Sequence, residues 1–282
     1  MEKKDIIDET FDPNRTETYE LSIEVSMNGL SYCIKDTVRD LYISLVSYPF
    51  ERSLSENDDC GDTISQFFAQ YDILSKKFKK VHLAFESKLF TLVPNDLFIP
   101  EKSKQLFELV HPLPELFEVR YNQIKEINAT LIFAIPSSLT AHWKFRQPLT
   151  VFIGQATPLI YYSIQNKTKD EPNVFANASD HFYINTISLN NELKFCNSFD
   201  AHNTVDTIYH IINSCNLNNI DPSKSQITLN GSFEDAELLE KILSNYFKKV
   251  TVDSGYEGHH YSYAIVKYKR TYWNLFNLSK CE

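Results

Sequence analysis

The sequence predicts an α/β protein of two lobes, each with a mixed sheet that opens with a β-hairpin. Three observations support this fold class. Strand-like and helix-like segments alternate along the chain, the order hairpin, helix, strand occurs twice, and a polar stretch at residues 165–173 without periodicity separates the two copies. We therefore expect a first lobe at residues 1–165, with an inserted α+β segment at about 90–150, and a second lobe at residues 166–282.

The first lobe is expected to begin with a hairpin. Residues 21–25 and 30–34 alternate apolar and polar side chains, and Asn28-Gly29 between them is a dipeptide typical of hairpin turns. Residues 41–48 predict the next strand of the same sheet.

A helix is expected from Asp62, a favourable N-cap residue, to the lysines at 76–80, because cations stabilise the C-terminus of a helix. Apolar residues three and four apart predict its buried face: Ile64, Phe67, Phe68, Tyr71 and Leu74. The rest of the first lobe is expected to form helices at 101–110 and from Ser138, and strands at 81–85, 90–93, 117–121, 130–135, 149–153 and 159–164.

The second copy is expected to begin with a hairpin at 182–196, where Ser188–Asn191 repeats the order of residue types of Ser26–Gly29. Further elements are expected to follow in this order: a helix from Asn203, a strand at 226–229, a helix capped by Ser232 and Asp235, a strand near 250–252 and a final strand in the aromatic tail at 261–278.

Charge and cysteine usage restrict the class of partner and the compartment. The chain has 28 Lys and Arg against 37 Asp and Glu, a formal net charge of −9, which disfavours binding to nucleic acid or to an anionic membrane. The 5 cysteines lack a C-x-x-C pair, so we expect reduced thiols. Residues 1–12 have no apolar core of a secretory signal and no run is long enough to cross a bilayer, so we expect a cytoplasmic protein.

Two hairpin-led copies of this order resemble the actin-like ATPase superfamily, whose lobes have a ribonuclease H-like fold. Particular segments are similar to an uncharacterised Bacteroidetes family, domain of unknown function 3822: Glu9–Asp12, Tyr19–Ile23, Asn28–Cys33, Phe90–Pro94 and Ile227–Gly231. The resemblance covers nearly the whole chain. It implies a bacterial protein with an actin-like fold and no established activity.

The resemblance also implies where a nucleotide would bind. The loop of the first hairpin has Glu24 in place of the superfamily's Asp, and Ser26 where its Gly is expected. The second phosphate loop would be Asn185–Ile187, which has no carboxylate and no glycine. The adenosine-contacting motif is half kept, as Asn230 and Gly231.

Glycine usage argues against that nucleotide. The chain has only 6 glycines, and they stand apart, whereas loops that wrap phosphates need clustered glycines for close backbone approach. We therefore expect a pseudo-ATPase with no ATP or Mg²⁺ cofactor, no catalytic residue and no enzymatic activity.

Other candidate chemistry is weak. His259-His260, with Asp253 and Glu257 nearby, could form a metal site, but a polar turn explains the pair better, and we expect no metal. Our main hypothesis is a catalytically degenerate actin-like scaffold or protein-binding module with protein partners. One alternative is a protein that binds a nucleotide or another phospholigand through a modified site. The other is a nucleic-acid-associated protein that uses the aromatic tail and the lysine run, which the acidity of the chain disfavours.

Overall fold

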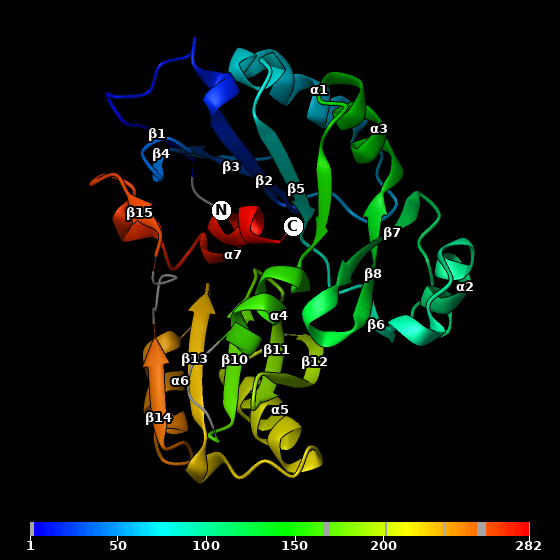
Figure 1. Cartoon of the computed structure of the whole chain (residues 1–282), viewed down its shortest axis with the longest axis vertical. Helices are drawn as coiled ribbons and strands as arrows, with labels where there is room; N and C mark the ends of the chain where they lie inside the picture. The colour runs from blue at the N-terminus through cyan, green and yellow to red at the C-terminus, as the bar shows by residue number, and fades with distance from the viewer. Residues whose placement is uncertain (1–2, 166–169, 201, 234, 253–257, 282) are drawn as a thin grey trace.

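The computed structural model describes residues 3–165, 170–200, 202–233, 235–252 and 258–281. A mixed sheet forms the centre of each lobe, and Figure 1 shows helices α4 (Ala156–Gln165) and α7 (Trp273–Asn277) between the two sheets. The predicted fold class, α/β with a duplicated layout, is confirmed.

The sheet of the first lobe has the strand order β1-β4-β3-β2-β5-β9. Its strands are β1 (Lys4–Ile7), β2 (Tyr19–Val25), β3 (Gly29–Asp36), β4 (Leu41–Pro49), β5 (Lys80–Phe85) and β9 (Val151–Gly154). β2, β3 and β4 pair antiparallel in succession, whereas β5 and β9 run parallel to β2. Helices α1 (Gly61–Gln70) and α3 (Ser137–Arg146) lie side by side on this lobe (Figure 1).

The sheet of the second lobe repeats this arrangement in the order β12-β11-β10-β13-β14. Its strands are β10 (Asn173–Ala178), β11 (Phe182–Leu189), β12 (Glu192–Asp200), β13 (Gln226–Gly231) and β14 (Lys249–Val252), and its helices are α5 (Thr204–Leu217) and α6 (Ala236–Leu243). β10, β11 and β12 are antiparallel, and β13 and β14 run parallel to β10. The counterpart of hairpin β2–β3 is therefore hairpin β10–β11.

This correspondence corrects the expected start of the second copy. The hairpin at 182–196 exists, but it is β11–β12, and Asn190 and Asn191 form its turn with φ values of 56° and 64°. The first strand, β10, was not predicted: the polar stretch at 165–173 takes in its first residue, and Asn177 interrupts the apolar pattern of the rest. Both side chains are buried, with Asn173 7% and Asn177 4% exposed, and the sequence pattern does not reveal this burial.

The inserted segment forms its own antiparallel sheet in the order β6-β8-β7, with helix α2 (Ser103–Glu108) beside it. Its strands are β6 (Phe90–Pro94), β7 (Phe117–Ile124) and β8 (Ala129–Pro136). Asn122 joins this sheet to the first lobe, because its amide donates to Phe152 O at 2.9 Å and accepts from Gly154 N at 2.7 Å.

Residues 159–164 are helical, so the predicted strand there is wrong. They belong to α4, most of whose side chains are buried between the lobes. An apolar run buried on every side has no diagnostic period, so strand and helix could not be distinguished from its pattern.

The lysine run also differs from its prediction. α1 ends at Gln70, and the 3₁₀ turn Asp72–Ser75 separates it from the lysines at 76–79. Lys80 is the first residue of β5. These cations therefore do not complement the C-terminus of a helix.

The tail returns to the first lobe. β15 (His260–Tyr261) pairs parallel with β4, and α7 packs against β2 and β3. The expected final strand is thus reduced to two residues, and most of the remainder is helical. The expected boundary at 165/166 places this tail in the second lobe, whereas its contacts lie largely with the first. Trp273 is buried with its ring centroid 4.9 Å from that of Phe175 and 5.3 Å from that of Tyr162.

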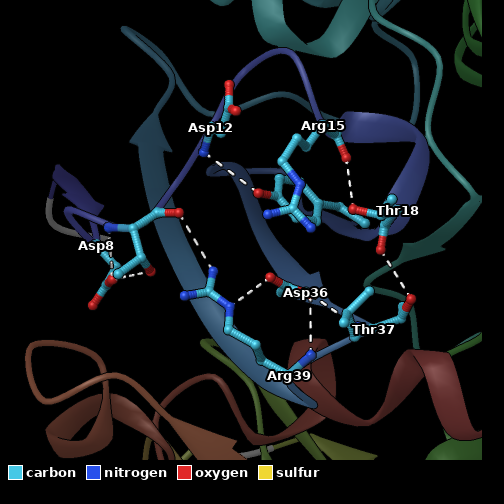
Figure 2. Close-up of polar contacts among 10 residues, drawn as sticks. Asp8, Asp12, Arg15, Thr18, Asp36, Thr37 and Arg39 are labelled. Atoms are coloured by element: carbon cyan, nitrogen blue, oxygen red, sulfur yellow. Dashed lines mark hydrogen bonds and ion pairs between the residues drawn. The ribbon is translucent and has the colours of Figure 1, made fainter.

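A polar network fixes the segment before β2 to the turn between β3 and β4 (Figure 2). Asp36 accepts hydrogen bonds from Arg39 Nε at 2.7 Å and Val38 N at 2.9 Å, and Thr37 Oγ1 donates to Thr18 O at 2.9 Å. Burial opposes the charge of Asp36, but these hydrogen bonds keep the pKa of its carboxyl below the ordinary value.

Across the described ranges, no helix is long and apolar enough to cross a membrane.

Candidate functional site

The equivalent hairpin turns of the two lobes touch each other. Asn28, in the turn between β2 and β3, donates from Nδ2 to Asp180 Oδ2 at 3.0 Å. The same nitrogen lies 3.3 Å from Nε2 of His181, and both partners belong to the turn between β10 and β11. The lobes are thus joined directly at the point where their first hairpins meet.

A cavity of about 320 Å³ lies beside this contact, between the lobes and the tail. Polar side chains dominate its lining. The lining residues are Lys4, Glu24, Ser26, Ser31, Glu86, Gln155, Asn177, Ala178, Ser179, Asp180, Ser232, Tyr268, Thr271, Tyr272 and Asn274.

Three carboxylates face this cavity. Glu24 is in β2, Glu86 directly follows β5, and Asp180 is in the second-lobe turn. Burial, with repulsion from Asp180, raises the pKa of Glu24 to about 7, and burial with repulsion from Glu24 and Asp180 raises the pKa of Glu86 to about 8. Near neutral pH these two carboxyl groups therefore retain protons that an exposed glutamate would lose.

The tail and the start of α4 supply amides to the site. Asn274 donates from Nδ2 to Glu24 Oε1 at 2.6 Å, which opposes the rise in the pKa of Glu24. Gln155 accepts from Ser87 N at 3.2 Å and donates to Ser179 Oγ at 3.1 Å, so it forms a second bridge between the lobes.

Several buried polar atoms at the cavity have no hydrogen-bond partner within the described part of the chain. They are Oδ1 of Asn177, Oδ1 of Asn274 and Oγ of Ser31. The first two residues are 4% exposed and Ser31 is 2% exposed. Because buried polar groups are nearly always satisfied, these atoms are ones that a water or another bound molecule would pair with.

Of the residues proposed from the sequence, Glu24 and Ser26 line the cavity. Ser26 Oγ accepts from Asn28 N at 3.1 Å and donates to Gly29 O at 3.3 Å, so this hydroxyl closes its own turn. Asn230 is fully buried at the end of β13, and the next-but-one residue, Ser232, reaches the cavity.

Gly231 holds the end of β13 against β10. Its φ is +81°, and a Cβ built there would lie 2.0 Å from Ala178 O. Only glycine fits here, because the backbones of β13 and β10 come too close to leave room for a Cβ. The same close approach places Ser232 beside the turn between β10 and β11.

Asn185 does not reach the site. It is fully buried in the middle of β11, and Ile187 belongs to the core of the second lobe. The expected second loop at 185–187 is therefore wrong, since the turn that faces the first lobe contains Ser179, Asp180 and His181.

Sequence reasoning missed Glu86, Asn177, Asp180 and Asn274. Glu86 had a usable signal, because it directly follows an apolar strand that runs parallel to β2. Asn177 and Asp180 would have followed from recognising β10. Asn274 had no such signal, since it lies 250 residues from its partner Glu24.

The histidine pair forms no metal site in the described residues, where no cluster of three His, Cys, Asp or Glu side chains is suitably placed. His259 is buried, and its Nε2 lies 3.1 Å from Oδ1 of Asn277. Burial lowers the pKa of His259 to about 4, so the ring is neutral. Asp253 and Glu257 lie outside the described residues.

The aromatic tail contributes mainly to the core. Trp273 is 1% exposed and Phe276 is fully buried, so these rings cannot stack on nucleic acid bases. Tyr263, at 95% exposure, projects from the tail.

Comparisons with known proteins agree with this architecture. A family model described as a protein of unknown function, DUF3822, matches residues 8–250. A solved protein of unknown function with an actin-like ATPase fold, from Bacteroides thetaiotaomicron, is 26% identical, with a TM-score of 0.76, and the match covers 86% of this chain and 94% of that one. A chain of the PilM–PilN type IV pilus biogenesis complex is 10% identical with a TM-score of 0.58, covering 93% of this chain and 97% of that one, which is a likeness of fold alone. No curated protein matches the sequence.

Proposed function

This chain belongs to the DUF3822 family and has the actin-like ATPase fold, and we propose that it has lost the catalytic activity of that fold. In this proposal the protein acts by binding, as a scaffold or protein-binding module. The observation that supports the loss of ATP hydrolysis is the contact between Asn28 and Asp180 at 3.0 Å. In actin-like ATPases the corresponding turns hold the phosphates between them. Here the two turns hydrogen-bond to each other.

The charge beside that contact supports the same proposal. A triphosphate placed at the turns would approach Asp180, and it would also approach Glu24 and Glu86 wherever these two carboxyl groups are ionised. Like charges within a few ångströms repel by about 1 kcal/mol even in bulk water, and by more where water is excluded. Nucleotide binding at this site is accordingly disfavoured.

The inserted sheet supports a protein-binding role. Large apolar side chains are exposed in the insert, between β6 and α2 and just after α2, including Leu97 at 66%, Leu109 at 80% and Val110 at 59%. Where such side chains form a contiguous patch, they are typical of protein interfaces. The structural neighbour from pilus biogenesis was solved as a complex of PilM with PilN, so the fold serves there within a protein assembly.

Free thiols at all the cysteines support a reducing cytoplasmic location as part of this proposal.

Thermal unfolding with and without ATP or ADP and Mg²⁺ tests the catalytic part. A ligand at one hundred times its Kd adds about 2.7 kcal/mol to the free energy of unfolding. We expect no shift at millimolar nucleotide. ATP turnover that disappears in Glu24→Ala would overturn the proposal.

The binding part needs a comparison of two surface variants. Leu109→Glu changes the exposed insert, and Leu217→Glu makes the same change on α5, where Leu217 is 73% exposed. We expect proteins captured by the wild type to be lost with Leu109→Glu and retained with Leu217→Glu. Equal capture by both variants would remove the insert as the binding surface.

A further inference from the structure

The interlobe cavity is rich in hydrogen-bond acceptors. The carboxyl groups of Glu24, Glu86 and Asp180 line it, together with Asn177 and Asn274, whose Oδ1 atoms have no hydrogen-bond partner within the described part of the chain. Leaving a buried acceptor without a donor is unfavourable. A ligand with several N–H groups would satisfy these atoms.

The carboxamide of Asn274 has a defined orientation at the cavity. Its Nδ2 donates to Glu24 at 2.6 Å, which leaves Oδ1 as the group without a donor. The carboxamide thus presents an acceptor, and the neighbouring Glu24 would supply a negative charge once a bound cation favours its ionised form. An ammonium or guanidinium group, which has donors and no acceptor, would suit this pair of groups.

The aromatic wall of the cavity suits a cation as well. Tyr268 and Tyr272 line it, and the ammonium of Lys4, another lining residue, already lies 5.0 Å from the ring centroid of Tyr268. A cation over an aromatic face is attracted by the ring, and more strongly where water is excluded.

We propose that the cavity between the lobes binds a small organic cation with several N–H donors, of the amine or guanidinium class. Its volume of about 320 Å³ is at the lower end of the range for small-molecule pockets, roughly 300–1,000 Å³. A metal ion is a poorer occupant, since the described residues do not place three His, Cys, Asp or Glu ligands together. The inference goes beyond the proposed function, and each can fail separately.

Isothermal titration of the full chain with agmatine tests the inference, in about 150 mM salt to screen the net negative charge of the protein. The matched probe is 1,4-bis(trimethylammonio)butane, which has the same charge of about +2 on a four-carbon chain and no N–H donor. We expect agmatine to bind and the bis-quaternary probe not to bind. Equal binding of the two probes, or no binding of agmatine at millimolar concentration, would overturn the proposal.

Variants locate the binding. We expect Glu86→Gln to weaken agmatine binding at least tenfold, while Glu192→Gln, an exposed glutamate of β12, leaves it unchanged. Binding that survives both Glu86→Gln and Glu24→Gln would contradict the proposed site.

A measurement on the wild type covers the case in which these variants fold poorly. A cation beside Glu24 and Glu86 favours their ionised forms, so binding near pH 7.5 should release protons. The binding enthalpy is then expected to vary with the ionisation enthalpy of the buffer, and its independence of the buffer would count against the site. A thermal shift with MgATP, by contrast, would overturn only the proposed function.

Discussion

Asn28 of the first lobe donates a hydrogen bond to Asp180 of the second, at 3.0 Å, across a sequence separation of 152 residues. Each residue lies in the turn of the hairpin that opens its lobe. The contact joins the two turns directly at the place where the cavity begins.

Removing this hydrogen bond should loosen the junction more than it destabilises the fold. We expect Asn28→Ala to lower the free energy of unfolding by about 0.5–1.5 kcal/mol, the usual contribution of one hydrogen bond. The amides around Asp180 should exchange hydrogen faster, since local opening no longer breaks that bond. Asn216→Ala, at an exposed position of α5, is the control. Unchanged exchange around Asp180 in Asn28→Ala would show that the bond does not restrain the lobes.

Gly231→Ala should be strongly destabilising. The added Cβ would meet Ala178 O at 2.0 Å in a backbone with φ of +81°, so β13 would have to move away from β10. We expect a loss of at least about 2–3 kcal/mol in urea unfolding. Gly61→Ala is the matched control, since its Cβ would meet chiefly the side chain of His142, whose ring can move, and we expect a change within about 1 kcal/mol there. Similar losses for both variants would contradict the role of this strand contact.

The raised pKa of Glu86, about 8, makes stability depend on pH. Between the ordinary glutamate pKa and about pH 8 the folded state keeps a proton that the unfolded state has released, so wild-type stability falls as pH rises. Glu86→Gln removes this loss. We expect the stability of Glu86→Gln relative to wild type, measured as the difference in free energy of unfolding, to be about 1–3 kcal/mol greater at pH 9 than at pH 5. One pKa unit corresponds to about 1.36 kcal/mol, and partial exposure of the carboxyl group reduces the effect.

Urea unfolding at the two pH values measures this difference. Glu192→Gln is the control, because the Lys194 ammonium lowers the pKa of the exposed Glu192 carboxyl. It should give no gain at pH 9. A pH dependence of Glu86→Gln equal to that of the wild type would show that the carboxyl ionises normally.

Trp273 should be among the most sensitive positions of the tail. Its ring is 1% exposed and packs against Phe175 of β10 and Tyr162 of α4. We expect Trp273→Ala to lower the free energy of unfolding by about 3–5 kcal/mol, since it leaves a large cavity between the lobes. Tyr263→Ala, which truncates a ring that is 95% exposed, should change it little. Comparable effects of the two substitutions would mean that the tail does not join the core.

The sequence predicts elements well where local pattern and burial agree. The start of α5 is such a case, because its N-cap Asn203 accepts from Asp206 N at 2.9 Å. Hairpin β2–β3 was predicted from its alternation and its Asn28-Gly29 turn, although β3 is buried on both faces. α4 was misassigned because burial on all sides removes its period. β10 was missed because its asparagines look like loop residues until their burial is known.

The site is less predictable than the fold. Glu24 and Ser26 were found because the superfamily places its first phosphate loop there, and both line the cavity. Asp180 was not found, since its turn could be located only after β10 was recognised. Asn274 reaches Glu24 through the return of the tail to the first lobe, a tertiary arrangement that no local pattern encodes.

The pairing of β15 with β4, and the packing of α7 on β2 and β3, have a consequence for synthesis of the protein. When the ribosome has released the chain up to residue 250, all strands of the second sheet except the end of β14 have emerged. β15 and α7, which pack on the first lobe, have not yet been made. The part translated first is therefore the part completed last. During elongation its apolar surface on β2 and β3 remains uncovered, which is where a chaperone would have reason to bind.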